Sequence, residues 1–172
     1  MRTALTIRPY APCDADALWA LLEPTFRAGE TYTVASDISR EDGLAYWTDA
    51  PHSVFLAEEH STPLGTFYIC PNKEGGGAHV ANAGFVTAPA ARGKGLARAM
   101  LHHAEAEARA RGYLAMQFNF VVATNAPALH IWQSEGYAEV GRLPRAFRHP
   151  RAGYVDAFVL YKELIEEWPD GR

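Results

Sequence analysis

The sequence contains little cysteine, and this excludes two kinds of protein. Its 172 residues include two cysteines, Cys13 and Cys70. Two isolated thiols supply neither a metal cluster nor the disulfide framework of a small secreted scaffold. We therefore expect no bound metal and no disulfide, and a reducing cytoplasm as the location.

Long apolar runs and an excess of basic charge are also missing. No segment approaches the roughly 20 apolar residues that cross a membrane, and residues 1–6 lack the apolar block of a signal peptide. The formal net charge is -4, whereas a nucleic-acid partner favours a basic surface. We therefore expect neither a membrane nor a nucleic acid as a partner.

The rest of the composition is that of a globular protein. Hydrophobic residues make up 48% of the chain and charged residues 21%, which suits a chain that buries a substantial core. The sequence has no repeat, low-complexity tract or long linker. Residues 1–172 are therefore predicted to form a single domain.

One stretch, residues 85–97, organises the chain. The apolar strand end Phe85-Val86-Thr87 is followed by a loop containing Arg92-Gly93-Lys94-Gly95, and a helix then begins with Leu96-Ala97. The first N–H groups of a helix have no intrahelical partner, and glycine lets a ligand approach the bare backbone. This turn is predicted to bind an anion, most naturally a pyrophosphate.

Two common pyrophosphate motifs do not fit this turn. A Walker A loop needs a Ser or Thr after its lysine to hold magnesium, but Gly95 follows Lys94. A dinucleotide fingerprint needs three spaced glycines and an acidic residue about 20 positions later, and this pattern is missing too. Taken alone, the turn also fits an ordinary connection between a strand and a helix.

Hydrophobic periodicity and turn residues predict a mixed α/β (α+β) fold. The predicted strands span residues 5–9, 54–58, 65–69, 78–87, 113–122, 137–140 and 154–161, and a basic loop that contains proline joins the last two. The predicted helices begin at Asp14, after Ser39, near Gly95 and at Thr124 or Asn125. Pro24 is expected to end or bend the first helix.

Two of these strands, 78–87 and 113–122, flank the predicted helix 95–111 in a βαβ unit. They are therefore expected to be parallel neighbours, whereas the earlier strands form an antiparallel meander. Helical spacing divides the helix into a predicted buried face and a predicted solvated face. These faces carry Ala97, Leu101, Ala104 and Ala108, and Arg98, His102, Glu105 and Arg109, respectively.

Two ordered motifs resemble those of the GCN5-related N-acetyltransferases. They are Val86-x-Ala88-Pro89 followed by Arg92-x-x-Gly95-x-Ala97, and Asn125-x-x-Ala128-x-x-Ile131-Trp132-x-x-x-Gly136-Tyr137. The resemblance covers nearly the whole chain. It implies a mostly antiparallel sheet of about seven strands with flanking helices. It also implies a central parallel pair that splays apart at the site of the co-substrate, acetyl-CoA.

A closer resemblance is to the yeast-type imino-acid N-acetyltransferases, which acetylate azetidine-2-carboxylate. It lies in residues 79–84, 117–125 and 154–158. The resemblance implies that Asn82 and Asn119 bind the acceptor and that Asn119 and Asn125 serve catalysis. An amide can donate to a carboxylate and accept from an amine, which suits orienting an amino acid. Asn125 at a helix start fits a capping role equally well.

The resemblance also implies how acetyl-CoA is held. The backbone N–H groups of residues 92–97 would bind the pyrophosphate, and Arg92 and Lys94 add positive charge. The backbone of Phe85, Val86 and Thr87 would pair with the pantetheine arm and polarise the thioester oxygen. Asn125 and Trp132 are expected on the cofactor side.

The sequence offers several alternatives for the proton-transfer groups. Trp132 stands where many family members have a tyrosine acid, and an indole N–H cannot serve as that acid. Water or the hydroxyl of Ser134 or Tyr32 could protonate the thiolate instead, and Tyr32 is also predicted to bind the substrate. The candidate bases Glu30, Glu58, Glu74 and His79 are not distinguished by spacing, and ordered water is a further alternative.

We therefore expect an enzyme that moves the acetyl group of acetyl-CoA to the amine of a small molecule such as an amino or imino acid. The alternatives are an N-acetyltransferase of proteins or peptides and a module that binds acyl-CoA without turnover. The resemblance further suggests a homodimer, with contacts from the 143–153 loop and the last strands.

Overall fold

The computed structural model describes residues 5–169, so the predictions for residues 1–4 and 170–172 lie outside it. The strands form one seven-stranded sheet in the order β1-β2-β3-β4-β5-β7-β6. The pair β4 and β5 is parallel, and the pairs β1 and β2, β2 and β3, β5 and β7, and β6 and β7 are antiparallel. The predicted mixed, mostly antiparallel sheet with one parallel pair is confirmed.

The elements follow the predicted order along the chain. The strands are β1 (Thr6–Pro9), β2 (Ser53–Glu59), β3 (Thr62–Pro71), β4 (Val80–Thr87), β5 (Ala115–Val122), β6 (Ala138–His149) and β7 (Gly153–Glu163). The α-helices are α1 (Ala15–Ala28), α2 (Arg40–Thr48), α3 (Leu96–Ala110) and α4 (Ala126–Ser134).

The chain divides into two compact units. One contains the chain up to Ile69 together with Gly84–Ala104, and the other contains Cys70–Ala83 together with the chain from Glu105 onward. The elements β3, β4 and α3 each begin in one unit and end in the other.

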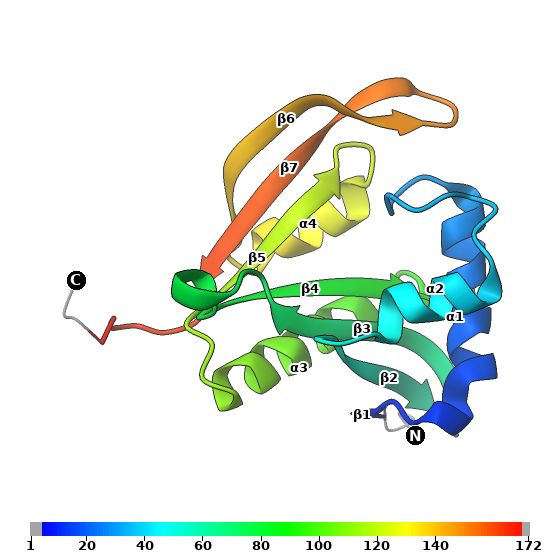
Figure 1. The fold of residues 1–172 in the computed structure, drawn as a ribbon, viewed down its shortest axis with the longest axis horizontal. Coiled ribbons are helices and arrows are strands. Elements are labelled where there is room, and N and C mark those ends of the chain that lie inside the picture. Colours follow the sequence, from blue (N-terminus) through cyan, green and yellow to red (C-terminus); the bar gives the residue numbers. More distant parts are fainter. Residues whose placement is uncertain (1–4, 170–172) are drawn as a thin grey trace. The chain divides into compact units, whose positions relative to one another are not determined.

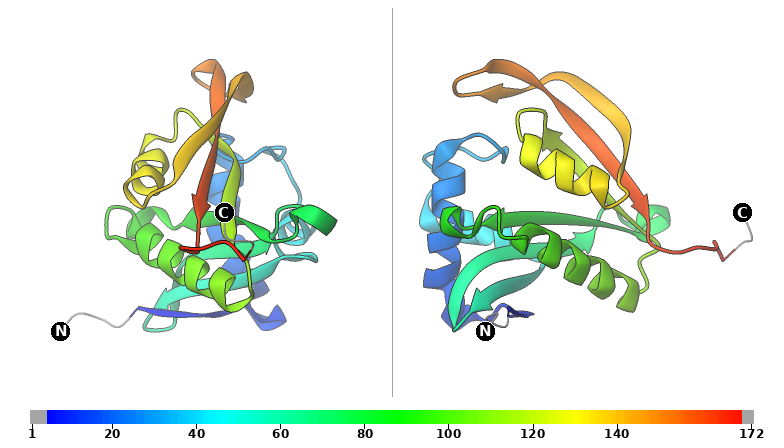
Figure 2. Two further views of the ribbon diagram at one scale, coloured as in Figure 1. Left: turned by 90° about the vertical axis from the view of Figure 1, so that its left-hand side faces the viewer. Right: turned by 180° about the vertical axis from the view of Figure 1, so that it is seen from behind.

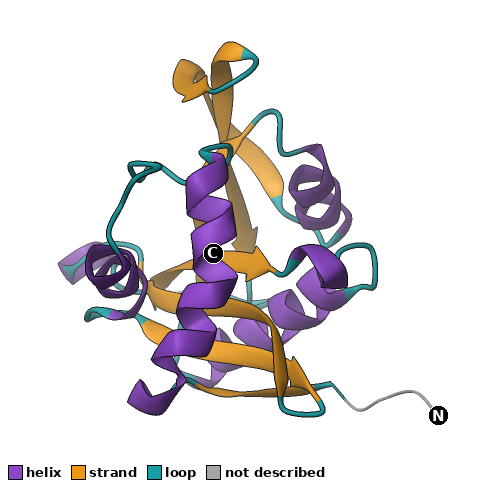
Figure 3. Ribbon diagram, turned by 90° about the vertical axis from the view of Figure 1, so that its right-hand side faces the viewer, coloured by secondary structure: helices purple, strands orange, loops and turns teal. Residues whose placement is uncertain are grey.

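In the first unit, α1 runs across the antiparallel strands β1 to β3, as Figures 1 and 3 show. Its buried residues are Leu18, Leu21, Leu22 and Phe26. Pro24 does not end this helix, which continues to Ala28. The apolar face on both sides of the proline is buried, and this burial outweighs the hydrogen bond that proline cannot donate.

In the second unit, β6 and β7 form a long hairpin, and α4 packs on β5 (Figure 2). The prediction of a basic loop between residues 140 and 154 was wrong, because most of this segment belongs to β6. Pro144 lies at an irregularity of the ladder between Leu143 and Phe147. Because β6 is the edge strand, a proline there costs no hydrogen bond to a further strand.

The second unit also corrects the prediction for the solvated face of α3. Glu105 is 4% exposed and thus buried. Its carboxylate accepts hydrogen bonds from Lys162 at 2.8 Å and from Arg109 at 3.3 Å. Periodicity placed Glu105 on the polar side of the helix, but two cations cover it and satisfy its charge.

Candidate functional site

The turn between β4 and α3 has the backbone geometry that its glycines predict. Gly93 and Gly95 have φ angles of +73° and +80°, a region that side chains rarely adopt. A Cβ atom added at either position would meet nothing within 4 Å. These glycines are therefore required by the backbone conformation, and the space beside them is open.

The same turn presents a row of unpaired backbone donors. Within residues 5–169, the N–H groups of Gly93, Lys94, Gly95, Leu96 and Ala97 donate no hydrogen bond. The carbonyl of Gly95 accepts the first helical bond, from Ala99 at 3.1 Å. Consecutive free amides at a helix start, beside the exposed Arg92 and Lys94, fit a pyrophosphate.

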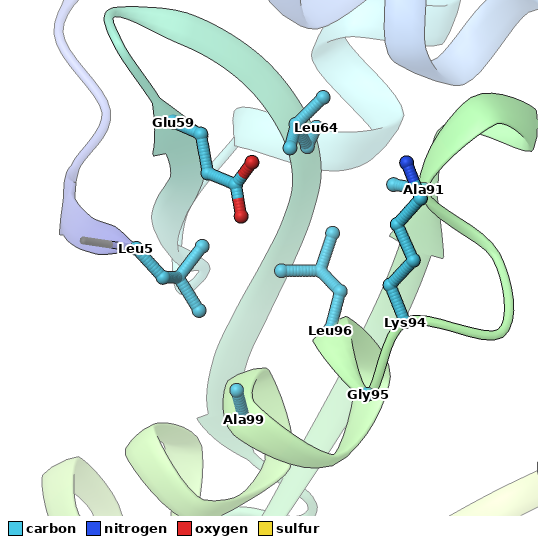
Figure 4. A pocket seen from close by; sticks show the side chains of 8 residues that line it. All are labelled: Leu5, Glu59, Leu64, Ala91, Lys94, Gly95, Leu96 and Ala99. Atoms are coloured by element: carbon cyan, nitrogen blue, oxygen red, sulfur yellow. The ribbon is translucent and has the colours of Figure 1, made fainter. Parts of the chain in front are cut away.

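A small pocket of about 140 Å³ lies beside this turn (Figure 4). It is lined by Leu5, Glu59, Leu64, Ala91, Lys94, Gly95, Leu96 and Ala99. The carboxylate of Glu59 points into it across from the Lys94 side chain. Because the pocket carries charges of both signs on an apolar lining, it does not select an anion. We assign the anion site instead to the unpaired N–H groups of residues 93–97, which we call the amide row.

The edge of β4 before the turn is occupied by a tyrosine hydroxyl. The N–H of Ala88 donates to Leu64 at 2.8 Å, on the β3 side. Backbone groups alternate between the two edges of a strand, so those of Phe85 point to the other edge. There the Tyr32 hydroxyl donates to the Phe85 carbonyl at 2.8 Å and accepts from the Phe85 N–H at 2.9 Å.

The loop between α1 and α2 holds Tyr32 firmly. Gly29 ends α1 in the left-handed conformation, and Nη1 of Arg27 donates to the carbonyls of Ser36 and Ile38 at 2.7 and 2.8 Å. The Tyr32 ring packs edge-on against Phe26, Tyr46 and Trp47, with centroid distances of 5.8, 6.5 and 5.5 Å.

Burial raises the pKa of Tyr32 well above its ordinary value. The hydroxyl therefore remains protonated at neutral pH. A thiol has a pKa near 8.5, so proton transfer from Tyr32 to a thiolate is unfavourable. The raised pKa argues against Tyr32 as the acid that protonates the departing thiolate.

The predicted asparagines of the second unit gather around Gln117. The Nδ2 atom of Asn82 donates to the Gln117 carbonyl at 2.9 Å. The Gln117 amide donates to Oδ1 of Asn119 at 2.9 Å, and Nδ2 of Asn119 donates to Oδ1 of Asn72 at 2.7 Å. We call Asn72, Gln117 and Asn119 the amide chain.

Asn82 has a local structural role as well. The paired positions of β4 and β5 are Val80 with Ala115 and Ala81 with Met116. One residue further on, the Asn82 side chain donates to the Gln117 carbonyl. An amide buried without a partner is costly, and the Asn82 amide has one in this carbonyl.

Sequence reasoning missed two members of the amide chain. Asn72 lies in the glycine-rich connection after β3, where asparagine is usually a turn residue. Gln117 lies inside a segment that carried the closer resemblance, but nothing in the sequence gave it a role. After the internal bonds are made, Asn72 and Asn119 keep N–H groups to donate, which suits a carboxylate.

The remaining predicted residues lie on or beside α4. Asn125 is the N-terminal cap position of this helix, but its side chain makes no capping hydrogen bond. The predicted cap is therefore not formed, although the Asn125 carbonyl accepts from Leu129 at 3.1 Å. Trp132 is buried against Phe118 at 5.2 Å, as a core residue would be. Ser134 donates to the Ile131 carbonyl at 2.8 Å.

No candidate base is distinguished by its geometry. Glu58 is paired with Arg8 at 3.2 Å. Glu74 and His79 are exposed in the connection before β4, and Glu30 lies in the loop after α1. Among residues 5–169, no three His, Cys, Asp or Glu side chains are placed to hold a metal ion.

The model of the acetyltransferase (GNAT) family matches residues 15–137 of this chain. The chain therefore belongs to the acetyltransferase (GNAT) family, as the two sequence motifs predicted. No helix in the described part of the chain is long and apolar enough to span a membrane.

Individual relatives agree with this assignment. A GCN5-related N-acetyltransferase from Kribbella flavida is 36% identical, with a TM-score of 0.88 over 93% of this chain and 98% of that one. N-acetyltransferase aca1 of Schizosaccharomyces pombe is 35% identical over 97 residues, 56% of this chain and 46% of the relative. The matched region thus spans about half of that curated relative.

The fold alone is shared with more distant structures. One is yncA from Salmonella typhimurium, which was solved with its cofactor acetyl-CoA. It is 20% identical, with a TM-score of 0.83 over 96% of this chain and 97% of that one.

Proposed function

We propose that this protein transfers the acetyl group of acetyl-CoA to the amine of a small molecule, and that the favoured acceptor is an amino or imino acid. The observation that carries the proposal is the row of unpaired N–H groups at the start of α3. Family membership and the acetyl-CoA bound to the distant neighbour yncA support the choice of ligand.

The backbone supplies the contacts to the co-substrate. The N–H groups from Gly93 to Ala97 bind the pyrophosphate, and Arg92 and Lys94 add charge. The backbone of Phe85–Thr87 pairs with the pantetheine arm, and the Phe85 N–H polarises the thioester carbonyl. Asn125 and Trp132 complete the cofactor side. When bound, acetyl-CoA supplies the acyl group that the amine attacks.

The amide chain supplies the contacts to the acceptor. Asn119 and Asn72 donate to its carboxylate, while Asn82 fixes the backbone position of Gln117. Asn125 serves as a polar partner for the reacting groups, because its side chain is not used as a cap. The amine loses its proton through water, since no side-chain base is distinguished.

Cytoplasmic location and a homodimer belong to the same proposal. Location is supported by the two free cysteines, one exposed and one buried. The homodimer is supported by the resemblance to the family.

The proposal is tested by thiol release from acetyl-CoA over a panel of amino acids, imino acids, polyamines, aminoglycosides and short peptides. Calorimetry with acetyl-CoA alone runs in parallel. We expect binding of acetyl-CoA and the highest kcat/KM with an amino or imino acid. Turnover with peptides alone would favour protein acetylation, and binding without any turnover would favour a non-catalytic module.

A further inference from the structure

We propose that the Tyr32 hydroxyl is a second hydrogen-bond donor to the thioester carbonyl oxygen, beside the N–H of Phe85. The inference rests on the proposed function and deepens it. It gives Tyr32 a catalytic role other than substrate binding or protonation of the thiolate.

The geometry places the hydroxyl where a ligand oxygen would bind. The Tyr32 oxygen lies 2.9 Å from the Phe85 nitrogen and accepts its N–H. A carbonyl oxygen that takes this N–H must replace the Tyr32 oxygen as the acceptor. The displaced hydroxyl then stands next to the incoming oxygen, and it can turn its proton from the Phe85 carbonyl to that oxygen.

The hydroxyl is prepared for this role before any ligand arrives. Three aromatic rings and the bonds from Arg27 to the loop fix the ring beside β4. Its raised pKa keeps the hydroxyl protonated at neutral pH. Because the ring is held in place, only the O–H bond must rotate to reach the thioester oxygen, and little reorganisation is then needed when negative charge develops.

The chemical step is balanced without proton loss from Tyr32. The amine nitrogen forms a bond to the carbonyl carbon, and negative charge gathers on the carbonyl oxygen between the two donors. The C–S bond then breaks, the thiolate leaves with the electron pair, and the nitrogen gives its proton to water. Tyr32 donates a hydrogen bond throughout and ends the step as it began.

The first test is Tyr32→Phe, which removes the hydroxyl and keeps the ring. We expect kcat to fall about 100-fold, the lower range for losing one such donor, while acetyl-CoA affinity changes little. The matched control is Tyr46→Phe, a neighbour in the same aromatic cluster, which should keep the wild-type kcat. Equal losses in both variants would overturn the inference, because they would reflect packing alone.

The second test needs no turnover. The infrared stretch of acetyl-CoA labelled with ¹³C at the carbonyl should have a lower frequency on the wild-type protein than on Tyr32→Phe, since two donors weaken the bond more than one. Equal frequencies would overturn the assignment of Tyr32. If the wild type binds acetyl-CoA but acetylates no acceptor, the proposed function fails, and the frequency difference still decides the role of Tyr32.

Discussion

Gly95 is required by its backbone conformation, because its φ of +80° is strained for any other residue. The substitution Gly95→Glu also places a carboxylate beside the unpaired amides, where it would repel phosphate. We expect this variant to lose acetyl-CoA binding measured by calorimetry.

Gly153 provides the matched control for that substitution. It has a φ of +73°, and nothing lies within 4 Å of an added Cβ atom. Gly153→Glu therefore carries similar backbone strain but no charge at the turn before α3. It should bind acetyl-CoA normally, and normal binding by Gly95→Glu as well would rule out the amide row as the pyrophosphate site.

Asn119 is the central member of the amide chain, with hydrogen bonds to Gln117 and Asn72. For Asn119→Ala we expect KM for the amino-acid acceptor to rise about tenfold, the effect of one lost hydrogen bond to a charged group. Acetyl-CoA affinity should stay nearly unchanged. Gln133→Ala, an exposed amide on α4, serves as control, and unchanged acceptor kinetics in Asn119→Ala would contradict the assignment.

For single residues, the sequence predicted which side chains belong to the site better than it predicted which side chains they contact. Asn82 and Asn119 could be selected because they match asparagines of the family that the sequence resembles. Asn72 could not, because an asparagine beside glycines is ordinarily a turn residue. The burial of Glu105 could not be predicted either, because its partner Lys162 is distant in the sequence.

At the scale of elements, the α1–α2 loop determines where Tyr32 lies. Arg27→Met keeps the apolar stem of the side chain but removes its donors to Ser36 and Ile38. We expect roughly a 10-fold loss of kcat, because a misplaced donor costs part of its effect. Limited proteolysis should show faster cleavage between residues 29 and 39. Arg111→Met, which loses an exposed ion pair with Glu107, should change neither property.

The start of the chain has a pH-dependent contact. Hydrogen bonds from Arg8 and then from the Ala11 N–H lower the pKa of Asp14. The stability that this carboxylate contributes is therefore full above the unfolded pKa of about 3.9, and it is lost as the pH falls through the folded value.

Asp14→Asn tests this dependence. Urea unfolding should show a loss of about 1 kcal/mol at pH 7, and the difference from the wild type should shrink as the pH falls below the unfolded pKa of about 3.9. The control is Asp16→Asn, since the Asp16 side chain is 96% exposed. A difference for Asp14→Asn that did not change with pH would contradict the assigned cause.

Elements were predictable where local signals agreed with the tertiary structure. The Ser39 cap formed as expected, with its side chain accepting from the Asp42 N–H. Local sequence signals predicted the wrong element where hydrogen bonding between two strands outweighed them. The segment between residues 140 and 154 looks like a basic loop, but Asp156 on β7 accepts from Arg142 and from the Arg145 N–H and stabilises the strand pair.

For the whole molecule, two motifs in the right order were sufficient to predict the family and the sheet. Each motif alone also fits an ordinary turn or helix cap, but together they specify a strand, an anion-binding turn, a helix and a second helix along one chain. The acceptor was not predictable in the same way, because it depends on side chains such as Asn72 that only the folded chain brings to Asn119.

The most direct test of this account measures CoA thiol and acetylated amine together, with the wild-type protein, acetyl-CoA and azetidine-2-carboxylate or a preferred amino acid. We predict that the two products form in equal amounts and that both are absent with Gly95→Glu. Thiol release without an acetylated amine, or undiminished product with Gly95→Glu, would contradict it.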